Sequence, residues 1–96
     1  MTSRSELSLS THRRIIDVIH TEWFNGGSFA IREVAAAADV SISSVLRTLH
    51  ILRQIRLISY SERAFAGRHY RVNNNWPQTM KEAIDAFEYA KILRMI

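Results

Sequence analysis

Near the middle of this 96-residue chain, hydrogen-bonding side chains recur at helical spacing. If residues 41–55 form a helix, steps of about 100° per residue place Ser43, Arg47, His50 and Gln54 on one outward face. This face offers hydroxyl, guanidinium, imidazole and amide groups, and it contains no acid. Such a set suits contact with base edges lying between two lines of phosphate. The chemistry indicated is recognition by hydrogen bonding.

Residues for metal or enzyme chemistry are sparse. The chain has no cysteine, and its four histidines do not fall at the spacing of a ligand set. There is no glycine-rich phosphate loop, no carboxylate pair in a pocket-forming context and no triad-like spacing of serine and histidine. We therefore expect no enzyme activity, no cofactor and no metal site.

The positive charge of the chain is concentrated in one block. The net charge is +4, and residues 31–72 carry all of it, with seven arginines, no lysine and three acids. The segments on either side are neutral. The planar fork of arginine suits paired hydrogen bonds to phosphate and guanine. The block therefore indicates a nucleic-acid partner.

Two helices are expected before the 41–55 helix. The first runs from a cap at Ser10 or Thr11 to about Trp23, where the glycines that follow end it, and residues 1–9 are expected to be flexible. An extended piece at 28–31 leads into a second helix. The inward positions of the three helices are apolar residues at helical spacing: Ile15, Ile16, Ile19, Trp23, Val34, Ala35, Ala38, Val45, Leu49 and Leu52.

After these helices, the pattern changes to that of a β-hairpin. Residues 57–62 and 68–73 are rich in β-branched and aromatic side chains, and a five-residue loop separates them. Pro77 suits the first turn of a last helix that runs to the C-terminus. The expected fold is mainly α with a small β-hairpin (α+β). We divide it into a domain at 10–75 and a C-terminal helix at 76–96.

Residues 34–49, "VAAAADVSISSVLRTL", resemble the helix-turn-helix core of bacterial repressors. In that pattern a glycine occupies the turn, and here Asp39 replaces it; aspartate tolerates the left-handed conformation. "LHILRQIRLI" and "GRHYRV" are similar to the helix end and the returning wing strand of winged regulators of the GntR, MarR and ArsR kinds. Arg56 stands where those families have a glycine, so this helix end could take another shape.

The resemblance implies a winged helix-turn-helix protein that binds double-stranded DNA. Helix 41–55 would enter the major groove, and the wing at 63–68 would meet the adjacent backbone or the minor groove. Ser41 would also cap that helix, and its dipole favours a phosphate near the serines that follow. The expected DNA contacts are Ser41, Ser43, Ser44, Arg47, His50, Arg63 and Arg68.

The apolar stripe of the last helix favours a homodimer, in which this helix pairs with its copy or packs with the first helix. The function expected is that of a sequence-specific, dimeric transcriptional repressor. Two alternatives stay open: a plasmid or phage protein that binds centromere or origin sites, and a winged-helix module that joins proteins. The polar N-terminus lacks a signal peptide, and no apolar run reaches membrane-spanning length, so we expect a cytoplasmic protein without membrane contact.

Overall fold

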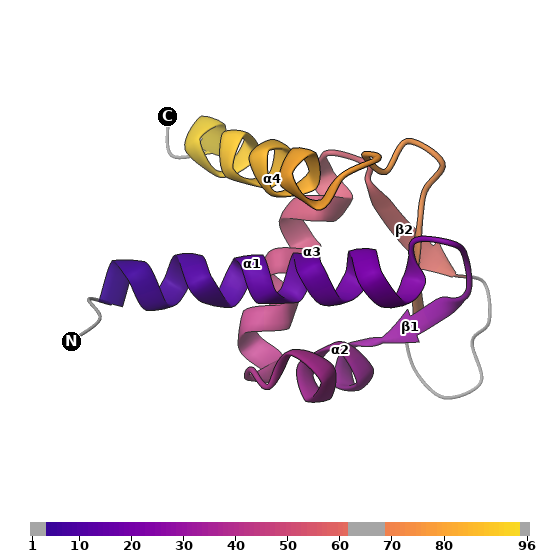
Figure 1. The fold of residues 1–96 in the computed structure, drawn as a ribbon, viewed down its shortest axis with the longest axis horizontal. Coiled ribbons are helices and arrows are strands. Elements are labelled where there is room, and N and C mark those ends of the chain that lie inside the picture. The colour runs from indigo at the N-terminus through magenta and orange to yellow at the C-terminus, as the bar shows by residue number, and fades with distance from the viewer. Residues whose placement is uncertain (1–3, 62–68, 95–96) are drawn as a thin grey trace.

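The computed structural model describes the backbone of residues 4–61 and 69–94, and the side chains of these ranges from Thr11 onward. These residues form four helices and a small three-stranded antiparallel sheet (Figure 1), which confirms the α+β prediction. In chain order the elements are α1 (Arg4–Trp23), β1 (Ser28–Ala30), α2 (Ile31–Ala38), α3 (Ile42–Gln54), β2 (Ile58–Ser61), β3 (His69–Val72) and α4 (Met80–Arg94).

Helix α1 begins earlier than the sequence analysis predicted. The expected start at Ser10 or Thr11 is wrong, because the helix extends back to Arg4 and includes most of the segment expected to be flexible. Serine costs only a few tenths of a kcal/mol in a helix, and extending a formed helix adds one hydrogen bond per residue. Serine-rich sequence therefore does not stop a helix. Figure 1 shows this end of α1 projecting beyond the other elements.

The sheet is larger than the predicted hairpin because β1 joins it. The strand order is β1-β3-β2, and both outer strands pair antiparallel with β3. Tyr70 lies opposite Phe29 on one side and Tyr60 on the other. Phe29 is fully buried and its ring centroid lies 6.0 Å from that of Tyr70. The extended piece at 28–31 was predicted, but its pairing with β3 was not.

Helices α1, α2 and α3 enclose the core with the faces that the periodicity predicted. Of the ten predicted inward residues, Trp23 is half-buried and the other nine are buried, six of them with no exposed surface. These nine belong to one cluster that also holds Phe29, Tyr70 and Trp76. Within the described ranges, no single helix is long and apolar enough to cross a membrane. Helices α2 and α3 have that length and composition only when taken together, and a 115° bend separates them.

Helix α4 starts three residues after Pro77, so the predicted first turn is wrong. Thr79 precedes the helix, accepts a hydrogen bond from the backbone N–H of Glu82 (3.2 Å) and donates one to its carboxylate (2.9 Å). A threonine followed three residues later by a glutamate is a stronger start signal than a proline, which also suits a turn.

One face of α4 packs inside the chain rather than on a second copy. Ala83, Phe87 and Ala90, which belong to the stripe assigned to dimerisation, are buried against the rest of the domain. Just before the helix, Trp76 is also buried, and its indole N–H donates to Nδ1 of His20 on α1 (2.9 Å). These groups complete the core, so the first three helices and the sheet do not close it without α4.

Candidate nucleic-acid interface

The turn between α2 and α3 is built around Asp39. Asp39 has φ 55° and ψ 54°, the left-handed conformation that the sequence analysis required of it. The N–H of Val40 reaches back to the carbonyl of Ala35 (3.1 Å), which closes the helix end. The Arg14 guanidinium of α1 donates to the carbonyl of Ala38, the last residue of α2. The chain changes direction by 115° here, and α1 holds it in place.

Ser41 caps α3 as predicted. Its backbone is extended, and its hydroxyl oxygen accepts a hydrogen bond from the N–H of Ser44 (3.2 Å). The hydroxyl groups of Ser41 and Ser44 also lie 3.0 Å apart. These two serines are therefore engaged with each other at the helix start, whereas Ser43 is exposed and has no such contact among the described residues.

The outward face of α3, formed by Ser43, Arg47, His50 and Gln54, is exposed along its length. Within the described part of the chain, Arg47 makes no hydrogen bond or ion pair, so its guanidinium is available to a ligand. The structure therefore brings together three predicted site residues, Ser43, Arg47 and His50, on one free surface.

Two exposed apolar residues on α3 escaped the sequence analysis. Ile42 is 49% exposed and Leu46 is 45% exposed, although both are large and hydrophobic. They lie beside the outward face rather than in the core. A helical wheel could have flagged Leu46, since it falls about 100° from the buried Val45. An apolar strip of this kind gives α3 a second means of contact besides hydrogen bonding.

A hollow of about 360 Å³ lies between α3 and the sheet. On its wall the guanidinium carbon of Arg53 stacks 3.9 Å from the ring centroid of Tyr60 on β2, and Arg53 donates to the Tyr60 hydroxyl (2.6 Å). The stacking joins α3 to the strand that leads towards residues 63–68. The lining residues are Leu46, Arg47, His50, Arg53, Tyr60 and Tyr70.

A polar link fixes the rotation of α3 against α1. The hydroxyl of the fully buried Thr48 donates to the carbonyl of Ser44 (3.0 Å) and lies 2.6 Å from Nδ1 of His12. Since the hydroxyl hydrogen goes to Ser44, His12 donates through Nδ1. Burial lowers the pKa of His12 below its ordinary value, and the positive charges of Lys91 and Arg47 lower it further. His12 is therefore held neutral beside the interface.

The end of α3 keeps the shape that a glycine would give it. Arg56 has φ 63°, so it takes the left-handed conformation itself. The N–H of Leu57 reaches the carbonyl of Leu52 (3.0 Å), and the Asn73 side-chain amide donates to the carbonyl of Arg56 (2.9 Å). Arg56 therefore takes the backbone conformation that glycine adopts most easily, and these hydrogen bonds hold the chain as it enters β2.

The remaining predicted site residues, Arg63 and Arg68, lie outside the described residues. The strands that flank them, β2 and β3, are placed beside α3 by the sheet. Among the described residues, no three histidine, aspartate or glutamate side chains gather as a metal-binding group.

Comparison with known proteins adds no relative to this description. No protein-family model, curated protein sequence or solved structure matches the chain. The case for a function therefore depends on the chain's own residues.

Proposed function

We propose that this protein is a winged helix-turn-helix protein that binds double-stranded DNA in a sequence-specific manner. The observation that carries the proposal is the free, acid-free outward face of α3, with Arg47 at its centre. Helix α3 follows α2 after a three-residue turn and a 115° change of direction. Helix-turn-helix motifs join their helices at about 90–120° through turns of three or four residues.

In the proposed complex, α3 lies in the major groove and uses two kinds of contact. Arg47 reaches a guanine edge or a phosphate, while Ser43 and His50 offer shorter hydrogen-bonding groups. Ile42 and Leu46 meet thymine methyl groups, which are the apolar feature of the major groove. Strands β2 and β3 would form the wing, and the contact of residues 63–68 with the neighbouring backbone or minor groove, which the resemblance to winged regulators implies, lies outside the described residues.

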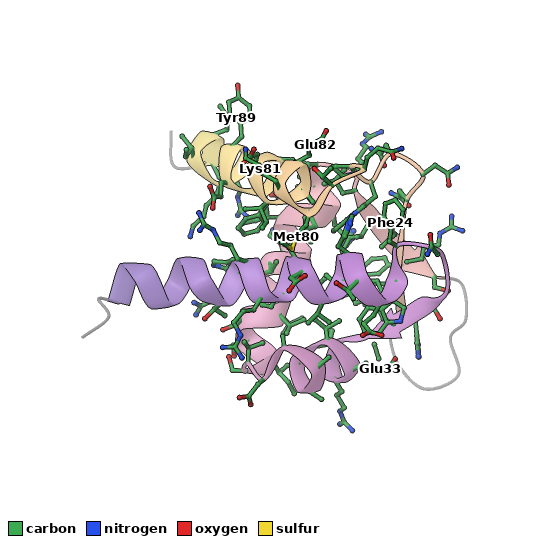
Figure 2. The ribbon with its side chains drawn as sticks, in the orientation of Figure 1. Phe24, Glu33, Met80, Lys81, Glu82 and Tyr89 are labelled. Atoms are coloured by element: carbon green, nitrogen blue, oxygen red, sulfur yellow. The ribbon has the colours of Figure 1, made fainter. Side chains whose placement is uncertain are left out.

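A homodimer remains part of the proposal, but it uses the exposed side of α4, which shares only Leu93 with the predicted stripe, because Ala83, Phe87 and Ala90 of that stripe are buried. Tyr89, Ile92 and Leu93 are 65%, 59% and 53% exposed. Tyr89 points away from the body of the domain (Figure 2). An exposed apolar strip on one helix suits a twofold contact with its copy. The dimer would bind twofold sites, and occupancy of such a site would repress transcription.

Selection of bound sequences from random duplex DNA tests the proposal. We expect one enriched sequence, and we expect Arg47→Ala to weaken its binding by about 1–3 kcal/mol, roughly 5- to 150-fold. Lys81→Ala is the control, because Lys81 lies on α4, is 84% exposed at its side chain and also carries one positive charge. Absence of duplex binding at low salt, or equal effects of both substitutions, would refute DNA recognition by α3.

The exposed pair Ile42 and Leu46 also favours a second candidate, a module that binds another protein through α3. The same selection separates the two. A chain that binds no duplex but forms a stable complex with another protein, lost in Leu46→Ala, would support the module. Enrichment of clustered direct repeats would instead assign the DNA binding to segregation or replication.

A further inference from the structure

A second cationic site lies on the other side of α3 from the sheet. We infer that this basic pocket binds a phosphate group, and that in the DNA complex this is a backbone phosphate beside the groove that α3 enters. The inference rests on the proposed function for the source of the phosphate, but not for the pocket itself. The residues that line the pocket are His12, Arg47, His50, Ile51, Lys91 and Arg94.

The pocket is a hollow of about 330 Å³ built by three helices. Helix α1 contributes His12, and α4 contributes Lys91 and Arg94 from its last turn. Helix α3 contributes the rest, including two residues of its outward face. Because Arg47 and His50 line both hollows, the basic pocket is continuous with the surface proposed to read DNA.

No acid among the described residues compensates the charge of the basic pocket. Among its lining residues that the structure describes, three are permanent cations, two are histidines and none is an acid. The nearest acids along α4 are engaged elsewhere: Glu88 accepts from Arg13 (3.2 Å) and Asp85 from Lys81 (2.8 Å). Within the described residues, neither Lys91 nor Arg94 forms an ion pair. An anion with several oxygens would satisfy these donors.

The half-buried imidazole of His12 responds to the positive charge of the pocket. Both Lys91 and Arg47 lower its pKa, which means that cations from α3 and α4 act on the same point. Its Nδ1 is occupied by Thr48, so the other ring nitrogen remains for a ligand. A bound phosphate would reverse the effect of the cations and raise the pKa of His12.

Position favours the DNA backbone as the source of the phosphate. A helix in the major groove has one DNA backbone, with its line of phosphates, on each side. The β2–β3 side of α3 would face only one of these two backbones. The basic pocket lies on the opposite side of α3 and would meet the other line. Helix α4 would then contact DNA through Lys91 and Arg94 while its exposed face remains free for a second copy.

The first arm of the test measures duplex affinity against salt concentration for Lys91→Ala and Arg94→Ala. Each should weaken binding to the selected sequence and to an unrelated duplex by similar factors. Each should also reduce the slope of log K against log salt by about one. Lys81→Ala, on the same helix but outside the pocket, should leave the slope unchanged. Alanine preserves the helix, and thermal unfolding checks that each variant folds.

The second arm titrates inorganic phosphate into the free protein and follows the His12 imidazole by NMR, with chloride at matched ionic strength as the control. We expect phosphate to raise the pKa of His12 in the wild-type chain, and Lys91→Ala to reduce this effect. Unchanged salt slopes with no phosphate response would overturn the inference. A phosphate response with unchanged slopes would overturn the backbone assignment in favour of a free phosphorylated ligand. Failure of the wild type to bind DNA would refute the proposed function, and the titration would still test the pocket.

Discussion

Substitution of Thr48 by valine should loosen α3 from α1 and lower stability. Valine has nearly the volume of threonine, so packing in the core is preserved and the hydroxyl alone is lost. The hydroxyl serves two partners, the Ser44 carbonyl at 3.0 Å and His12 Nδ1 at 2.6 Å. The Ser44 carbonyl belongs to a helix and keeps other partners, but the His12 N–H loses its acceptor in a half-buried place.

The size of the effect follows from these two contacts. A hydrogen bond contributes about 0.5–1.5 kcal/mol net, and a buried donor left without a partner costs about 1–3 kcal/mol. Because water can partly reach His12, we expect Thr48→Val to lower the free energy of unfolding by about 1–2 kcal/mol. For a domain of this size, a change of 1 kcal/mol shifts Tm by about 4–8 °C.

Urea unfolding of a small set of variants measures this change in the free energy of unfolding. Thr48→Ser is the matched control, since it keeps the hydroxyl and removes a methyl group, which costs about 0.8 kcal/mol. In a double-mutant cycle, Thr48→Val and His12→Ala should show a coupling energy of about 1 kcal/mol. If Thr48→Ser is the more destabilising substitution and the coupling is near zero, packing rather than the polar link holds α3, and our reasoning is refuted.

Three further predictions concern His12, Arg56 and Leu46. The pKa of His12 in the folded chain lies below its ordinary 6.5, so the unfolded chain binds more protons below that pH. The free energy of unfolding should therefore fall as the pH drops below 6.5 and level off below the folded pKa. In urea unfolding at a series of pH values, His12→Gln should reduce this dependence of the unfolding free energy on pH. Arg56→Gly should raise the free energy of unfolding by about 0.5 kcal/mol, since glycine relieves the left-handed backbone at some entropic cost; a decrease would contradict this account of the helix end. Deoxyuridine lacks the methyl group of thymine, so placing it at a base pair contacted by Leu46 should weaken DNA binding by the wild-type chain about fourfold, or about 0.8 kcal/mol. The same replacement should leave DNA binding by Leu46→Ala unaffected. Equal losses of affinity in both proteins would exclude a methyl contact by Leu46.

Local sequence patterns predicted much of the fold because each depends on near neighbours along the chain. The helical period identified the buried side of α3, including Val45, Leu49 and Leu52. The Ser41 cap needs only the N–H three residues later, and the Asp39 turn needs only a residue that tolerates a left-handed backbone. These features are short-range, so one sequence contains enough information to place them.

The boundaries that were wrong have a different cause. The serine-rich start of α1 and the proline before α4 are weak signals, and helix extension or a better cap overrides them. The left-handed Arg56 shows the same limit, because the Asn73 amide that holds its carbonyl comes from beyond β3. Sequence alone does not show which distant group will supply such a contact.

The residues of the candidate site also fall into two groups, those placed by local sequence spacing and those placed by tertiary contacts. The sequence by itself determined that Ser43, Arg47 and His50 share one helical face without an acid, because spacing along α3 is enough for that. Tertiary structure decided which face of α4 is buried, and it placed Lys91 beside Arg47 at a separation of 44 residues. It also paired His12 with Thr48 and left Leu46 exposed. Those contacts depend on how helices dock, and docking is set by the shape of the whole core rather than by any local pattern.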